Sequence, residues 1–189
     1  MMIKPQDYYW RTIDLPNFLT IQKKTQNFIE NHTSLLNRAL FDGNVYQIQY
    51  SEQIIKEVPE LTQDFLTLNL NILACALFVA WPDLDTHIPH IDHLTLNNRA
   101  RINLPIFNCA QTYTAFYTNY TAEERRLANG EYYSVITNKD YIETTRVELT
   151  QPTLLRISEP HAILVNQARK YPRITLTVKC NPDAVTLFG

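Results

Sequence analysis

A histidine and an aspartate two residues apart, His90 and Asp92, are the residues in this sequence best suited to chemistry. A second histidine, His161, follows 69 residues after Asp92, and Arg173 lies 12 residues beyond it. Two imidazoles and one carboxylate are the ligands that hold non-haem Fe(II) on one face and leave its other positions open for reaction. An arginine can bind the carboxylate of a cosubstrate through two parallel hydrogen bonds. The spacing therefore predicts an Fe(II) site at His90, Asp92 and His161, with Arg173 as an anion-binding residue.

Other metal-binding pairs are open in the same segment, HIPHIDH, because His87 and His93 flank the first pair. His87 could act with His90, and a cluster of histidines also suits a zinc site or a cupin-like metal site. His87 and His93 could equally be residues of a surface loop. The pair His90 and Asp92 is preferred because residues i and i+2 of a strand face the same side, so both can reach one ion.

Two stretches of the chain, 99–104 and 173–178, alternate polar and apolar residues. The polar members are Arg99, Arg101, Asn103, Arg173, Thr175 and Thr177. In an ordinary antiparallel sheet such a face is exposed to water, where Arg99 and Arg101 would pair with surface carboxylates such as Glu143. Beside a metal the same face could instead line the cavity, where a threonine hydroxyl such as that of Thr175 adds a hydrogen bond to a carboxylate. The alternation alone leaves both interpretations open.

The elements that must position these residues change in character along the chain. Before residue 70 the pattern predicts an extended segment over 7–15 and helices beginning at Pro16, Ser51 and Pro59. After residue 70 it predicts seven short strands, over 72–80, 100–107, 112–117, 143–149, 153–157, 162–165 and 174–178. Many short strands without long helices between them are typical of two antiparallel sheets packed as a sandwich or jelly roll. We therefore expect one mostly β domain over 1–189, with a helix-rich part (1–69) supporting a β core (70–189).

Composition argues against several classes of protein. A net charge of −2 over 189 residues gives no reason to expect a nucleic acid or an anionic membrane as partner. The N-terminus lacks the apolar core of a signal peptide, and the longest apolar run, 72–82, is too short to span a bilayer. Cys75, Cys109 and Cys180 are odd in number and widely spaced, which indicates free thiols in a reducing cytoplasm. The sequence thus predicts a cytoplasmic protein.

His90-Ile91-Asp92, His161 and Arg173-Ile174-Thr175 together resemble the 2-oxoglutarate/Fe(II) oxygenase superfamily. The stretch 98–104 is similar to the Arg-x-Arg-x-His strand of aspartyl/asparaginyl β-hydroxylase-like members, where the second arginine and the histidine contact the cosubstrate. The resemblance implies these roles for Arg101 and Asn103. Asn103 replaces that histidine, and Asp92 is present where mammalian-type members of this branch lack the carboxylate. The first 65 or so residues show no resemblance.

The fold that the resemblance implies is a double-stranded β-helix, cupin-like, with helices on one side. The implied activity is hydroxylation of a C–H bond with Fe(II), 2-oxoglutarate and O2, on a small molecule or an amino-acid or peptide side chain. Two alternatives remain: a cupin-type metalloenzyme that does not use 2-oxoglutarate, and a non-enzymatic jelly-roll binding protein. The segment 118–130, flanked by aromatic residues, is either a lid over the site or a solvated surface turn.

Overall fold

The computed structural model describes residues 6–34, 46–49, 51–81, 88–92, 99–126, 132–165 and 171–188, with side chains for all of these except 46–49 and 132. His87 and His93, and with them the question of their roles, lie outside the described residues. No helix within the described ranges is both long enough and apolar enough to cross a membrane.

Short helices alternate with strands in the first part of the chain. The elements are α1 (Gln6–Tyr9), β1 (Trp10–Thr12), α2 (Phe18–Asn31), β2 (Tyr46–Gln49), α4 (Ser51–Glu57) and α5 (Pro59–Thr67). Strands dominate the rest: β3 (Asn71–Ala80), β4 (His90–Ile91), β5 (Arg101–Phe107), β6 (Tyr113–Thr118), β7 (Ala122–Arg126), β8 (Tyr132–Ile136), β9 (Ile142–Glu148), β10 (Thr153–Leu155), β11 (His161–Leu164) and β12 (Arg173–Asn181), followed by the 3-10 helix η1 (Ala184–Phe188).

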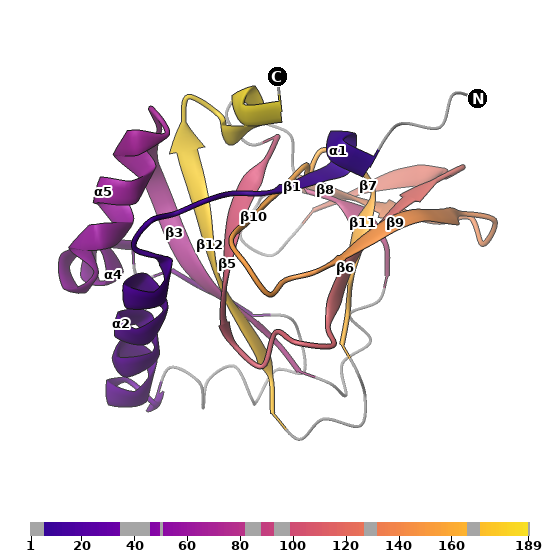
Figure 1. The fold of residues 1–189 in the computed structure, drawn as a ribbon. Helices are drawn as coiled ribbons and strands as arrows, with labels where there is room; N and C mark the ends of the chain where they lie inside the picture. Colours follow the sequence, from indigo (N-terminus) through magenta and orange to yellow (C-terminus); the bar gives the residue numbers. More distant parts are fainter. Residues whose placement is uncertain are drawn as a thin grey trace.

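The strands form two antiparallel sheets of six strands each. The first sheet has the order β1-β10-β5-β12-β3-β2, and the second has the order β7-β8-β4-β11-β6-β9. Figure 1 shows the first sheet between the helices and the second sheet. The expected architecture of mostly β structure in two antiparallel sheets is therefore confirmed.

Helices α2, α4 and α5 cover one face of the first sheet (Figure 1). Their buried side chains, among them Phe28, Ile54 and Leu61, share one hydrophobic core with Ile102 of β5 and Leu176 of β12. Burial of each such side chain stabilises the fold by roughly 1.5–3 kcal/mol. Because successive strand residues point to opposite faces, the polar residues of β5 and β12 must face the second sheet. In the two alternating stretches, the apolar side chains thus pack against the helices, and the polar side chains face the space between the two sheets.

All seven expected strands are present, as β3, β5, β6, β9, β10, β11 and β12, and helices begin at Ser51 and Pro59 as predicted. The extended segment expected over 7–15 is wrong in its first part, since α1 covers residues 6–9 and only 10–12 form a strand. The N-terminal part also supplies both edges of the first sheet, because β1 pairs with β10 and β2 with β3. In the segment 118–130, residues 122–126 form the exposed strand β7, paired with β8, so this part is neither a turn nor part of the cavity lining. Thr118 ends β6, residues 119–121 connect it to β7, and residues 127–130 are outside the described part.

Candidate metal centre and its cavity

His90, Asp92 and His161 lie together between the two sheets. Nε2 of His90 is 3.5 Å from Oδ1 of Asp92, and Nε2 of His161 is 3.9 Å from the same oxygen. One potential ligand atom from each residue lies within 4.8 Å of the others. With metal–ligand bonds of about 2.1 Å, small side-chain rotations suffice to bring all three to one ion. This group could hold a metal ion.

Strand pairing explains the convergence of the two histidines. His90 of β4 and His161 of β11 are direct partners in the antiparallel ladder, so their side chains project from the same face, and the ring centroids are 4.7 Å apart. Asp92 follows β4 by one residue, and its backbone N–H donates to the Ile157 carbonyl at 3.3 Å. The two-residue spacing therefore places the side chains of His90 and Asp92 on the same side of the chain, as the sequence pattern predicts.

The second nitrogen of each imidazole fixes which nitrogen faces the metal position. Nδ1 of His90 lies 3.1 Å from the Ile88 carbonyl, and Nδ1 of His161 lies 2.9 Å from the Glu159 carbonyl. A carbonyl only accepts hydrogen bonds, so Nδ1 carries a proton in both rings, and Nε2 is the nitrogen that presents a lone pair to a metal once the imidazole is neutral. Such carbonyl contacts orient metal-ligating histidines in proteins. With both imidazoles deprotonated at Nε2, the donor set would be two neutral nitrogens and one carboxylate oxygen, which fits a divalent ion.

The three groups also shift one another's protonation. Burial would lower the pKa of His90, but the adjacent Asp92 carboxylate outweighs it and raises that pKa. Burial likewise acts to raise the pKa of Asp92, but the hydrogen bond from His90 and the charges of His161, His90 and Arg101 lower it to about 2. Burial and the neighbouring His90 lower the pKa of His161 to about 4. Near neutral pH Asp92 is therefore anionic and His161 is neutral, as metal binding requires.

A cavity of about 120 Å³ extends from this group between the sheets. It is lined by polar residues of β5 and β12, by Phe78 of β3, and by side chains in or directly after β10 and strands of the second sheet. The lining residues are Phe78, His90, Asp92, Arg101, Asn103, Thr114, Leu155, Ile157, His161, Ile163, Arg173, Thr175 and Thr177. Pockets for drug-sized ligands are typically about 300–1,000 Å³. This cavity therefore suits a small molecule.

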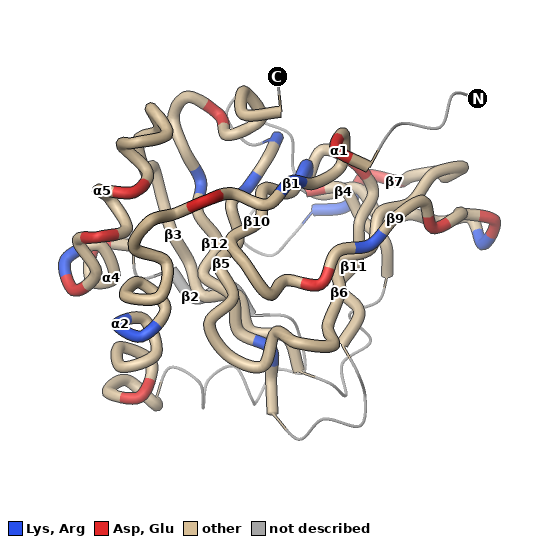
Figure 2. Tube along the Cα trace, in the orientation of Figure 1, with Lys and Arg blue, Asp and Glu red and all other residues tan. Residues whose placement is uncertain are grey.

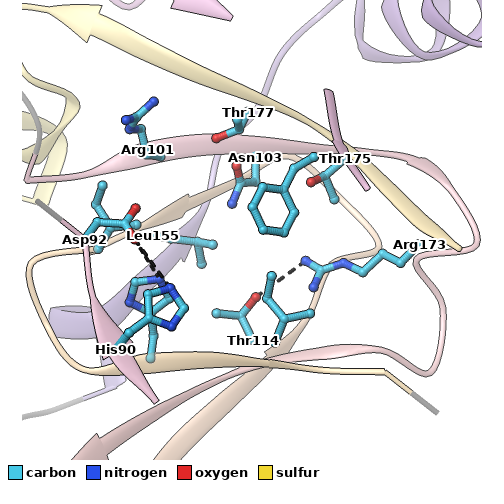
Figure 3. A pocket seen from close by; sticks show the side chains of 13 residues that line it. His90, Asp92, Arg101, Asn103, Thr114, Leu155, Arg173, Thr175 and Thr177 are labelled. Atoms are coloured by element: carbon cyan, nitrogen blue, oxygen red, sulfur yellow. Dashed lines mark hydrogen bonds and ion pairs between the residues drawn. The ribbon is translucent and has the colours of Figure 1, made fainter. Parts of the chain in front are cut away.

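Arg173 lies at the end of the cavity away from Asp92 (Figure 3). Arg173 is 2% exposed, and its Nη2 donates to the Thr114 hydroxyl over 3.5 Å. Nε and Nη1 have no hydrogen-bond partner among the described residues, where Arg173 also forms no ion pair with a carboxylate. Burial lowers the pKa of Arg173, but a guanidinium remains charged in proteins. A buried cation with free donors that faces a cavity is an arrangement suited to binding an anion.

The structure brings the other predicted site residues to the same cavity. Arg101 lies near Asp92 and contributes to the lowered pKa of that carboxyl. Asn103 and Thr175 lie between the metal group and Arg173 (Figure 3), and Oδ1 of Asn103 is a buried acceptor without a partner among the described residues. Arg99, by contrast, is exposed. The surface pairing considered for Arg101 does not occur with Glu143, since that carboxylate pairs with Arg146 at 2.6 Å.

Some cavity residues could not be recognised from the sequence. Thr114 sits in the run Tyr113–Thr118, where a single buried threonine is unremarkable, and its role follows only from the contact with Arg173. Leu155 and Ile157 form an apolar wall near the metal group, but their sequence pattern is that of ordinary core residues. Only the pairing of distant strands places them at the cavity.

Comparison with known proteins adds no family assignment. The sequence matches no protein-family model, and no curated protein is significantly similar to it. The site must therefore be interpreted from its own geometry.

Proposed function

We propose that this protein is an Fe(II)- and 2-oxoglutarate-dependent oxygenase that hydroxylates a C–H bond. The observation that carries the proposal is the pairing, in one small cavity, of a His-Asp-His group with a buried Arg173 that has no carboxylate partner among the described residues. A cosubstrate that chelates a metal through one end and carries a carboxylate at the other would fill both positions. 2-Oxoglutarate has this chemistry.

The strand order supports the finer assignment of the fold as a double-stranded β-helix. Four strands of the first sheet, β10-β5-β12-β3, face four of the second, β4-β11-β6-β9, while β1, β2, β7 and β8 extend the edges. In this arrangement the metal group comes from β4, the residue after it and β11, while Arg173 begins β12, so both sheets contribute to one site.

Each residue has a role in this proposal that follows from its position. His90, Asp92 and His161 hold Fe(II), which when bound supplies the centre where O2 is reduced as 2-oxoglutarate and substrate are oxidised. Arg173 binds the distal carboxylate of 2-oxoglutarate, and Thr175 lies beside it. Arg101 and Asn103 stabilise the metal-side end of the cosubstrate through charge and hydrogen bonding. The reaction is balanced as 2-oxoglutarate, O2 and R–H giving succinate, CO2 and R–OH.

The cavity walls contribute by excluding water. Phe78, Leu155, Ile157 and Ile163 present apolar surface among the polar groups. In such an environment the charge of Arg173 acts on a carboxylate more strongly than it would in water. Orientation and water exclusion are what a protein adds to a reaction whose chemistry belongs to its cofactor.

An anaerobic titration tests the proposal. Fe(II) is added to the protein with and without 2-oxoglutarate, and the weak visible charge-transfer band of the chelate is recorded. We expect the band in the wild type and its loss in Asp92→Ala. On admission of O2, succinate should form from 2-oxoglutarate. Tight metal binding without the band would favour a cupin-type enzyme that uses no 2-oxoglutarate, and absence of metal binding would favour a non-enzymatic binding protein.

A further inference from the structure

The turn between β10 and β11, residues 156–160, contacts two of the three residues of the metal group. The Glu159 carbonyl lies 2.9 Å from Nδ1 of His161, and the Ile157 carbonyl accepts the backbone N–H of Asp92 at 3.3 Å. The first contact orients the imidazole, and the second fixes the backbone that carries the carboxylate. The position of this turn therefore helps to determine where the ligand atoms of His161 and Asp92 lie.

The N-terminal helix α1 holds this turn through the side chain and the backbone of Tyr8. The Tyr8 hydroxyl donates to Oε1 of Glu159 at 2.6 Å, and the Tyr8 carbonyl accepts from Nε of Arg156 at 2.7 Å. The backbone N–H of Arg156 donates to the Tyr9 carbonyl at 2.9 Å. Charged positions of both signs lie around α1 and β1 (Figure 2). Tyr8 and Glu159 are 151 positions apart in the sequence, so only the fold brings them together.

A second path of contacts from α1 reaches the His161 ring through apolar packing. Tyr9 is 0% exposed, and its ring centroid lies 5.4 Å from that of Phe116. The Phe116 ring centroid lies 6.1 Å from that of His161, its direct partner in the ladder between β6 and β11. Because buried side chains are closely packed, these rings oppose displacement of the imidazole. His161 is thus restrained by packing and by the Glu159 carbonyl, and α1 contributes to both restraints.

We propose that Tyr8 is a positioning residue for the metal centre: its hydroxyl holds the Glu159 side chain, and Glu159 presents the carbonyl that orients the His161 imidazole. Outer contacts of this kind affect metal affinity because they fix the ring of a ligating histidine. Tyr8 acts through Glu159 and touches no ligand atom itself. The inference rests on the proposed function only in treating His90, Asp92 and His161 as metal ligands.

Tyrosine suits this role because its ring and its hydroxyl have separate partners. The ring centroid lies 4.2 Å from the guanidinium carbon of Arg156, and the hydroxyl reaches Glu159. Phenylalanine at position 8 would keep the ring contact and remove only the hydrogen bond. Because Pro160 follows Glu159, it restricts the Glu159 backbone to extended conformations. A displacement of the Glu159 side chain is therefore transmitted to the carbonyl that contacts His161.

Co(II) binding to the metal-free protein tests the proposal, because the visible bands of bound Co(II) report the geometry of its ligands. The variants are Tyr8→Phe, Glu159→Gln, Glu159→Ala and the double variant Tyr8→Phe/Glu159→Ala. Arg11→Met is the matched control. Arg11 donates to the Leu187 and Phe188 carbonyls at 3.0 and 3.1 Å, so its replacement loosens the same N-terminal segment without removing a contact to the turn. The readouts are the Co(II) Kd by calorimetry, the Co(II) spectrum and the Tm of the metal-free protein.

Tyr8→Phe and Glu159→Ala should each bind Co(II) roughly three- to tenfold more weakly, with an altered spectrum, because each breaks the same hydrogen bond. The double variant should lose no more affinity than either single variant, since both substitutions remove one shared interaction. Glu159→Gln keeps an acceptor for the Tyr8 hydroxyl and should bind Co(II) like the wild type. Arg11→Met should lower Tm and leave the Co(II) Kd and spectrum unchanged.

An unchanged Co(II) Kd and spectrum in Tyr8→Phe, additive losses in the double variant, or an equal loss of affinity in Arg11→Met would overturn the positioning role and leave the metal assignment intact. Absence of Co(II) binding by the wild type would overturn both the positioning role and the metal assignment. If Co(II) binding depends on Tyr8 but 2-oxoglutarate leaves the Co(II) spectrum unchanged, the positioning role stands and 2-oxoglutarate as cosubstrate is refuted.

Discussion

Replacement of Arg173 by methionine should stabilise the ligand-free protein and at the same time destroy its affinity for 2-oxoglutarate. Arg173 is 2% exposed, and among the described residues its guanidinium has only the 3.5 Å contact from Nη2 to the Thr114 hydroxyl to offset its burial. Burying a charge costs several kcal/mol when it lacks a partner, and methionine of similar length removes that cost. We expect a gain of about 1–3 kcal/mol in the free energy of unfolding.

For a protein of this size a change of 1 kcal/mol moves Tm by about 2–4 °C, so the ligand-free variant should melt roughly 2–12 °C above the wild type. Loss of a charge-assisted pair should cost about 2–4 kcal/mol in binding. That loss corresponds to a Kd for 2-oxoglutarate weaker by roughly 30- to 1,000-fold. Differential scanning calorimetry and isothermal titration calorimetry measure the two effects on the same samples.

Arg156→Met is the matched control for this experiment. Nε of Arg156 donates to the Tyr8 carbonyl at 2.7 Å, and the guanidinium lies 4.2 Å from the Tyr8 ring centroid and 4.3 Å from that of Phe188. Because this arginine has partners, its replacement should lower Tm and leave the Kd for 2-oxoglutarate unchanged. A lower Tm for ligand-free Arg173→Met, or an unchanged Kd, would refute the conclusion that Arg173 is a cation kept for an external anion.

Further predictions concern the metal end of the cavity. Asp92→Ala should cut Fe(II) affinity and turnover together, and so should His161→Ala, as measured by anaerobic titration and succinate formation; full activity of either variant would refute the ligand assignment. Arg101→Ala should weaken 2-oxoglutarate binding and turnover far more than Arg99→Ala, and equal small effects would show that Arg101 has no role in the cavity. Mn(II) affinity should fall by about tenfold per pH unit below the raised pKa of His90, because a proton must leave before the ion binds; constant affinity from pH 8 to 5 would contradict this.

The metal group was predictable from the sequence because its geometry depends on local rules. A two-residue spacing fixes the common side of His90 and Asp92, and only the pairing of β4 with β11 had to be supplied by the fold. β4 itself, two residues long, has no pattern of its own to detect. β7 escaped prediction for a different reason: all five of its residues are exposed, so no hydrophobic alternation marks it as a strand.

The environment of the polar face of β5 and β12 could not be predicted from the local sequence. Alternation correctly identified the two strands, but it cannot tell whether a polar face meets water or another sheet. Residues distant in the sequence determine which environment the polar face has, because the apolar side chains of α2, α4 and α5 cover the opposite face of these strands. Thr114 was missed for the same reason, because it acquires its role only through contact with Arg173.

The N-terminal helices therefore support the site energetically as well as sterically. Ile102, Leu104, Leu176 and Val178 are 0% exposed on the outer face of the first sheet, where they join the core formed with the helices. At roughly 1.5–3 kcal/mol for each buried side chain, this face supplies more stabilisation than the several kcal/mol that a buried, unpaired guanidinium costs. The opposite face of the same strands can then hold Arg173 without a carboxylate partner among the described residues. Arg173 can therefore stay buried in the ligand-free protein, although its charge is destabilising, because the helix-packed face of the sheet stabilises β12, the strand that carries it.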